Sequence, residues 1–168
     1  MKVSNKAITG FIKVVVFSSL LIAIILVVLV KTTVPKTPAT TEQVREVLVT
    51  LGYEPQDITK QFSELESTLN QCIAIQKNDI RFEFYDFNNS NSAIDAYGDA
   101  HSLIIRTKMA LPRVQTQTDK ANYSIYTLEA AGEYSVAIHV GTTAVYAYSN
   151  ADNRNEINNI LDAIDYLK

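Results

Sequence analysis

One uncharged and strongly apolar run, Val14 to Val30, limits what the rest of this chain can fold into. Its seventeen residues are about 25 Å long as a helix, and Phe11 to Lys13 extend that helix to about 30 Å, the thickness of a bilayer core. The long side chain of Lys13 can reach the membrane surface. We therefore predict one membrane-spanning helix, with the lipid bilayer as its partner.

Basic residues flank this helix mainly on its N-terminal side. Lys2, Lys6 and Lys13 precede it without an acidic residue, whereas Glu42 and Glu46 soon follow the cations behind it. Because Lys and Arg stay on the cytoplasmic side, we expect the N-terminus inside the cell. The predicted parts are a cytoplasmic leader at 1–10, a signal-anchor helix at 11–30, a Thr/Pro linker at 31–40 and an extracytoplasmic domain at 41–168.

Two other interpretations of the N-terminal segment stay open. Cleavage as a signal peptide would use small residues soon after the apolar run, and Thr37-Pro38-Ala39 is the candidate. Gly10-Phe11, between a short basic leader and an apolar helix, resembles the processing site of type IV prepilins. That resemblance implies a pilin-like assembly subunit processed after Gly10. The sequence departs from the family at Val15, where prepilins usually have Glu, and at Lys31 to Pro38, which interrupts the helix.

The part of the chain after Lys36 has about 130 residues, the size of one ordinary domain. It holds all eighteen acidic residues against ten Lys and Arg, a formal charge of −8. This charge argues against nucleic acid as a partner, because nucleic acid requires a basic surface. The single cysteine excludes an internal disulfide, and the apolar run around Cys72 predicts a buried thiol.

Amphipathic helices and alternating strands make up the predicted domain. A Thr-x-x-Gln capping box at Thr40 begins a helix that ends near Gly52, and a weaker helical pattern covers 62–69. Because most strands follow one another in hairpins, we predict an α+β two-layer sandwich of about five mainly antiparallel strands with amphipathic helices on one face. Strands are expected at 72–76, 80–87, 123–128, 133–140 and 143–149, further helices at 93–109 and 152–167, and a long polar loop at 113–122.

Alternation along the strands gathers polar and aromatic side chains on the sheet face that the helices are expected to leave uncovered. Tyrosine gives a large contact area at low entropic cost and keeps a hydroxyl for hydrogen bonding, which suits recognition of a partner. A purely structural role is the alternative, because strands favour aromatic residues in general. The candidate binding residues are Arg81, Glu83, Tyr85, Ser135, His139, Tyr146 and Tyr148.

No pattern in the sequence indicates catalysis. Ser135 and His139 are four residues apart on one predicted strand, about 13 Å, which is too far for a nucleophile and its base. Glu83 and Asp86 fall on opposite faces of their strand, and His101 is expected on a solvated helix surface. The sequence has no phosphate-binding loop and no zinc-binding motif, so we expect no metal and no cofactor.

These observations together predict a membrane-anchored, non-catalytic binding or scaffolding module of the cell envelope, with an envelope protein as its partner. Its organisation, with a basic leader, one anchor, a Thr/Pro spacer and a small domain, is similar to that of many envelope proteins of Gram-positive bacteria. The alternatives are the pilin-like subunit and an enzyme whose site is assembled only by the fold.

Overall fold

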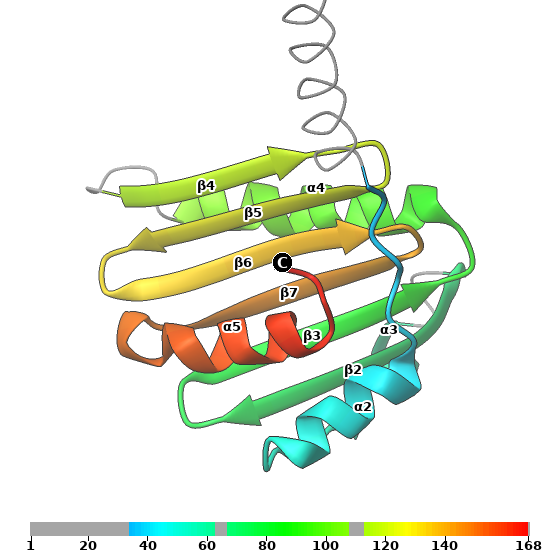
Figure 1. The fold of residues 1–168 in the computed structure, drawn as a ribbon, viewed down its shortest axis with the longest axis horizontal. Helices are drawn as coiled ribbons and strands as arrows, with labels where there is room; N and C mark the ends of the chain where they lie inside the picture. Colours follow the sequence, from blue (N-terminus) through cyan, green and yellow to red (C-terminus); the bar gives the residue numbers. More distant parts are fainter. Residues whose placement is uncertain (1–33, 63–66, 108–112, 168) are drawn as a thin grey trace, which may run out of the picture. The chain divides into compact units, whose positions relative to one another are not determined.

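One antiparallel sheet organises the part of the chain that the computed structural model describes, residues 34–62, 67–107 and 113–167 (Figure 1). The strand order is β1-β2-β3-β7-β6-β5-β4, and every neighbouring pair is antiparallel. The α+β class is thereby confirmed, but the sheet has seven strands rather than about five. The strands are β1 Gln56–Asp57, β2 Leu69–Lys77, β3 Ile80–Phe87, β4 Arg113–Asp119, β5 Tyr123–Ala130, β6 Glu133–Val140 and β7 Thr143–Asn150.

Two antiparallel meanders, β1–β3 and β4–β7, meet where β3 pairs with β7. The connection between the meanders is the helix α4, Ser90–Thr107, which leaves β3 and leads to β4 at the opposite edge of the sheet. The other helices are α2 Thr41–Thr50, α3 Thr59–Phe62 and α5 Arg154–Ala163, with a 3₁₀ turn, Ala151–Asn153, before α5.

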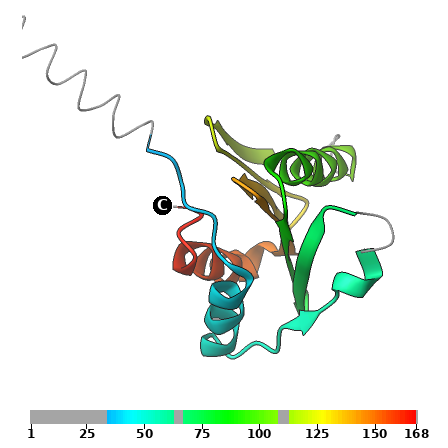
Figure 2. The ribbon, with the colours of Figure 1, turned by 90° about the vertical axis from the view of Figure 1, so that its right-hand side faces the viewer.

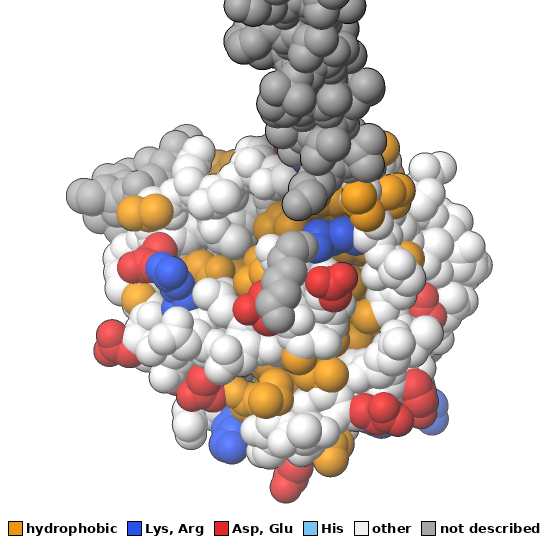
Figure 3. Space-filling view, viewed as in Figure 1, with side chains coloured by type: hydrophobic (Ala, Val, Ile, Leu, Met, Phe, Trp, Pro, Cys, Tyr) orange, Lys and Arg blue, Asp and Glu red, His pale blue; other side chains and the backbone are white. Residues whose placement is uncertain are grey.

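The helices cover both faces of the sheet, so the prediction of helices on one face is wrong. Seen along the sheet, α2 and α5 lie on one side and α4 lies on the other (Figure 2). The reason is that β5 and β6 carry apolar side chains on both faces. Val136 and Ile138 of β6 pack with α2 and α5, whereas Ala137 of β6 and Leu128 of β5 pack with α4. On the face that carries α5, acidic and basic side chains are scattered rather than gathered into one patch (Figure 3).

The main core lies between the sheet and the helices α2 and α5. Fully buried side chains from α2 and α5, such as Leu48 and Ile160, pack on Phe82 and Phe84 of β3 in one hydrophobic cluster. The predicted capping box of α2 is confirmed, with the Thr40 hydroxyl accepting from the Gln43 backbone N–H at 3.2 Å and the Gln43 side chain accepting from the Thr40 N–H at 2.8 Å.

Three local predictions differ from the structure. Residues 113–119 form the edge strand β4 where we expected a loop, because pairing with β5 outweighs the absence of a hydrophobic pattern. The weak helical pattern was predicted at 62–69, but α3 is Thr59–Phe62 and Leu69 already begins β2, while residues 63–66 lie outside the described part. The last helix begins at Arg154, after the 3₁₀ turn, with Asn153 at the cap position where we expected Asp152.

Residues 1–33 lie outside the described part, and the predicted spanning helix at 11–30 lies within them. In the described part of the chain, no helix combines the length and the apolar character needed to cross a membrane. The compact domain begins at Pro35. Part of the predicted linker therefore belongs to it: Ala39 is buried and its backbone N–H donates to the Tyr166 hydroxyl at 3.0 Å.

The turn between β6 and β7 contains Gly141 at φ +55°, as expected for a tight hairpin. A Cβ at Gly141 would lie only 2.5 Å from Cγ of Pro38, whereas Gly132, at φ +77°, has no atom within 4 Å of such a Cβ. We expect Gly141→Ala to lower the free energy of unfolding by about 2 kcal/mol and Gly132→Ala by about 1 kcal/mol, since both substitutions meet backbone strain but only the first meets a clash. Urea denaturation of the two variants measures this difference, and equal losses would contradict it.

Candidate functional site

The seven candidate residues lie on one face of the sheet, across β3, β7 and β6. Arg81 is paired with Tyr148, which is paired with Ser135 on its other side. Glu83 is paired with Tyr146, while Tyr85 and His139 are both paired with Ala144. The predicted common face therefore exists, but it is the face that α4 crosses.

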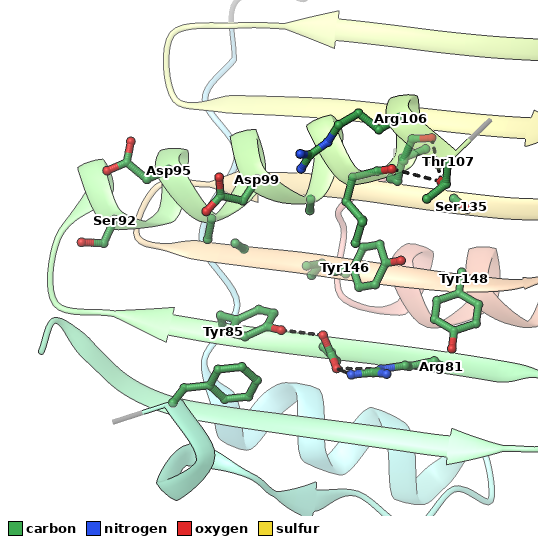
Figure 4. Close-up of a pocket in the computed structure, with 18 of the residues that line it drawn as sticks. Arg81, Tyr85, Ser92, Asp95, Asp99, Arg106, Thr107, Ser135, Tyr146 and Tyr148 are labelled. Atoms are coloured by element: carbon green, nitrogen blue, oxygen red, sulfur yellow. Dashed lines mark hydrogen bonds and ion pairs between the residues drawn. The ribbon is translucent and has the colours of Figure 1, made fainter. Parts of the chain in front are cut away.

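A groove of about 1140 Å³ lies between α4 and the strands β3 and β7 (Figure 4). We call it the α4 groove. Six of the seven candidates line it, and His139 does not. The strands contribute Arg81, Glu83, Tyr85, Ser135, Tyr146 and Tyr148, and α4 contributes Ser92, Asp95, Ala96, Asp99, Ala100, Leu103, Ile104, Arg106 and Thr107.

Glu83 is the buried centre of the groove floor, with only 3% of its surface exposed. One carboxylate oxygen, Oε1, accepts from Nε of Arg81 at 2.7 Å and also contacts Nη2 of the same guanidinium. The other oxygen accepts from the Tyr85 hydroxyl at 2.5 Å. The hydrogen bond to Glu83 raises the pKa of Arg81, and burial followed by the charge of Glu83 raises the pKa of Tyr85. Glu83 therefore fixes the positions of two groove residues.

Two tyrosines of β7 form the middle of the groove floor. The rings of Tyr146 and Tyr148 are 5.9 Å apart and tilted by 51°. The Tyr148 hydroxyl points toward the Arg81 guanidinium (Figure 4), and burial raises the pKa of Tyr146. Both rings are half-buried, so each keeps part of its surface for contact. This pair provides flat, amphipathic area beside an oriented cation.

The α4 groove has an aromatic end and an acidic stretch of rim. At one end the Tyr85 ring lies 5.7 Å from Phe62, edge to face, and 6.3 Å from the stacked ring of Phe87. Asp95 and Asp99 lie four residues apart on the α4 rim, and both carboxylates are exposed. The groove therefore combines an aromatic end, an acidic rim and a polar floor. Such a surface suits a ligand with both apolar and basic groups.

His139 is buried beneath α4, with 6% of its surface exposed, so our placement of it on an uncovered face is wrong. Its ring lies 5.7 Å from that of Tyr97, which also stacks on His101 at 5.7 Å. His101 lies 4.3 Å from Tyr126 and is half-buried, so it is not on the solvated helix surface that we expected. Both histidines are covered in this way because Tyr97, His101 and Ile104 form a stripe along α4 that faces β5 and β6. The i, i+4, i+7 spacing of these three residues is the feature of the sequence that could have predicted that they face the sheet.

Four buried polar atoms in this cluster have no hydrogen-bond partner among the described residues. They are the hydroxyls of Tyr97 and Tyr126, Nε2 of His101 and Nδ1 of His139. Burial lowers the pKa of His139, and the charge of Asp119 acts in the opposite direction. Burial also raises the pKa of Tyr97 to about 12. Burial under α4 therefore disfavours the protonated form of His139.

We expect the stability of the domain to fall as the pH drops below about 6.5, the usual pKa of histidine. Tyr97 of α4 packs against the His139 ring, and the charge of Asp119 on β4 acts on it. Tyr97 in turn stacks on His101, which contacts Tyr126 of β5. Because the pKa of His139 is lower in the folded chain, the unfolded chain binds the proton first and acid favours unfolding, by at most about 1.4 kcal/mol per pH unit. Above pH 7 His139 is neutral in the unfolded chain as well, so its titration no longer reduces the stability of the domain.

Urea denaturation at pH 7.5 and 5.5 measures this effect. The loss of stability at the lower pH should be about 1 kcal/mol smaller in His139→Gln, which cannot titrate, than in the natural chain. Carboxylates titrate in both proteins, so their effect on stability is the same in each and cancels in the comparison. An equal loss in both would show that His139 is not responsible.

Neither a metal site nor a reactive thiol is found in the described ranges. No three His, Cys, Asp or Glu side chains there are close enough together to hold a metal ion. Cys72 is fully buried, which confirms the predicted core thiol, and burial raises its pKa. A buried thiol of raised pKa is a poor nucleophile.

Comparisons with known proteins add little to this geometry. No protein-family model matches the sequence, and no curated protein matches it either. Among solved structures, the chain is similar to a GTP binding regulator from Thermotoga maritima, with 10% sequence identity and a TM-score of 0.46 over 80% of this chain and 93% of that chain. A similarity this distant does not bear on ligand, partner or activity.

Proposed function

We propose that this chain is a single-pass, membrane-anchored protein of the cell envelope whose extracytoplasmic domain is a non-catalytic binding module, with its partner held in the α4 groove. The observation that carries the proposal is that six residues chosen from their pattern in the sequence line one groove. The apolar run Val14 to Val30 supports the anchor, and the lysines before it support the orientation.

The chemistry of the α4 groove favours a protein segment as the partner. Apolar side chains suit the end formed by Phe62 and Phe87, and basic side chains suit the rim at Asp95 and Asp99. The oriented Arg81 and the tyrosine hydroxyls supply hydrogen bonds of the kind that a peptide backbone uses. We therefore propose an envelope protein that presents a segment with both apolar and basic residues.

Site-specific labelling tests the anchor and its orientation. Asn159 on α5 is exposed, whereas the natural Cys72 is fully buried and should give little background. In intact cells a membrane-impermeant maleimide should label Asn159→Cys and leave Ser4→Cys, in the predicted cytoplasmic leader, unlabelled. Labelling of Ser4→Cys, or recovery of the Asn159→Cys protein outside the membrane fraction, would refute this part of the proposal.

Photo-crosslinking tests the groove itself. A benzoyl-phenylalanine in place of Tyr148 should give an adduct of defined mass in intact cells, while the same group in place of Asn159, on the opposite face, should not. Asp95→Lys with Asp99→Lys should remove the adduct by reversing the charge of the rim. Identical adducts from both positions, or an adduct that survives the charge reversal, would contradict binding in the α4 groove.

A further inference from the structure

The strand β4 is a long open edge of the sheet. On one side β4 pairs with β5, in a continuous register that runs from Arg113 opposite Ala130 to Asp119 opposite Ser124. On its other side it pairs with no described strand. The strand at the other edge, β1, has only two residues. Val114 of β4 is 71% exposed, the highest value among the large exposed hydrophobic residues of the described part. The sequence 113–119 contains no proline, lysine or bulge of the kind that protects natural edge strands.

The hydrogen-bond pattern fixes which residues of β4 are open to pairing. The backbone N–H of Lys120 donates to the carbonyl of Tyr123 at 2.8 Å, at the start of the β4–β5 ladder. Because hydrogen-bonded residues alternate in an antiparallel pair, residues 118, 116 and 114 also bond to β5. Residues 113, 115, 117 and 119 therefore direct their N–H and C=O groups outward. These four residues are the hydrogen-bonding edge that a further strand would meet.

We propose that β4 pairs antiparallel with β4 of a second copy of this chain, around a two-fold axis at Thr116, into one sheet that continues through both copies. In this register Gln115 lies opposite Gln117, and position 113, an arginine, lies opposite Asp119 at both ends. Each of the seven residues of β4 then lies opposite a residue of the second copy, and the four outward-directed residues all form hydrogen-bonded pairs. A shift by two residues in either direction leaves residues unpaired and loses the match of charges.

The sequence of β4 is complementary to itself when two copies run antiparallel, which favours a second copy as the partner at this edge. The residues after Lys36 carry a formal charge of −8, which opposes contact between two copies over most of their surface. The β4 segment has no net charge in its sequence, with one Arg and one Asp, and only the two-fold register sets these two positions opposite each other. An edge of seven residues is small beside a standard interface, so the pairing is weak in dilute solution and needs a covalent trap to be observed.

Cysteine cross-linking of the full chain in its native membrane tests the register. Directly opposite residues have Cβ atoms about 4.5–5.5 Å apart, close to the range of a disulfide, so Thr116→Cys should form a disulfide with itself under mild oxidation. Val114→Cys and Thr118→Cys lie opposite each other and not opposite themselves. Each should stay monomeric alone, and the two should form a mixed dimer when co-expressed. The three positions lie on an exposed edge strand, and the chain without a substitution is the background.

A backbone substitution provides a second, independent measurement. Gln117→Pro removes an outward N–H without removing a bond to β5, so Thr116→Cys with Gln117→Pro should form at least tenfold less dimer than Thr116→Cys alone. Equal cross-linking of the cysteines at 114, 116 and 118, each expressed alone, would show random collision and would overturn the proposal. So would a Thr116→Cys chain that forms no dimer, or a dimer that the proline leaves unchanged.

Discussion

Replacing Phe82 with Ala is expected to lower the free energy of unfolding by about 3–5 kcal/mol. Phe82 is fully buried in β3, the strand that joins the two meanders, and it belongs to the cluster that α2 and α5 cover. Truncation loses the transfer free energy of the ring and leaves a cavity, because the neighbouring strands hold the backbone in place on both sides.

Urea denaturation of the full chain in detergent, followed by tyrosine fluorescence, measures this loss. Val114→Ala is the matched control, since Val114 is 71% exposed on the edge strand and should change stability by less than about 0.5 kcal/mol. A loss below about 1.5 kcal/mol for Phe82→Ala would contradict the assignment of Phe82 to the centre of the core.

The sequence predicted those elements whose signals are local. The alternation of Ile, Phe and charged residues predicted the range 80–87, and the same kind of alternation predicted 133–140; both agree with the structure. The capping box at Thr40 predicted the start of α2. The strand β4 could not be predicted in this way, because all of its residues except Val114 are polar and only the pairing with β5 makes it a strand.

The candidate site was predictable in part for the same reason. Period-two alternation correctly placed Arg81, Glu83 and Tyr85 on one face, because the side-chain direction along a strand is a local property. Their neighbours Tyr146 and Tyr148 depend on the pairing of β3 with β7, which are about sixty residues apart in the sequence. The cover by α4 depends on the path of a connection across the whole sheet. Local patterns contain no information about that path.

His139 shows how this limit affected one residue. Ser135, Ala137 and His139 alternate with apolar residues, which is typical of a half-exposed strand, yet β6 is buried on both faces from Tyr134 onward. The helix α4 supplies the second cover, and its aromatic residue Tyr97 packs against the histidine ring. A polar residue on a central strand therefore indicates a solvent-facing side chain only when no distant helix returns to that face.

Replacing Glu83 with Ala is expected to lower the free energy of unfolding by about 2–3 kcal/mol. The substitution leaves the Tyr85 hydroxyl and the Arg81 guanidinium without their acceptor. The side chain of Arg81 is 42% exposed, so water can solvate part of its charge, and the loss stays below that of a fully buried ion pair. The expected partner adduct at Tyr148 should decrease as well, because Glu83 holds Arg81 beside that ring.

Two further variants separate the loss of the hydrogen-bond acceptor at position 83 from the loss of one negative charge in the groove. Glu83→Gln keeps a carbonyl oxygen for one of the two donors and should lose about half as much stability as Glu83→Ala. Asp99→Asn lies on the exposed rim of the same groove and should leave stability unchanged, so it controls for the removal of one negative charge. If Glu83→Ala were as stable as Asp99→Asn, the buried carboxylate would not be the group that organises the groove floor. If its stability fell but the adduct at Tyr148 stayed at full yield, Glu83 would support the fold alone, and the binding surface would have to lie nearer the aromatic end formed by Phe62 and Phe87.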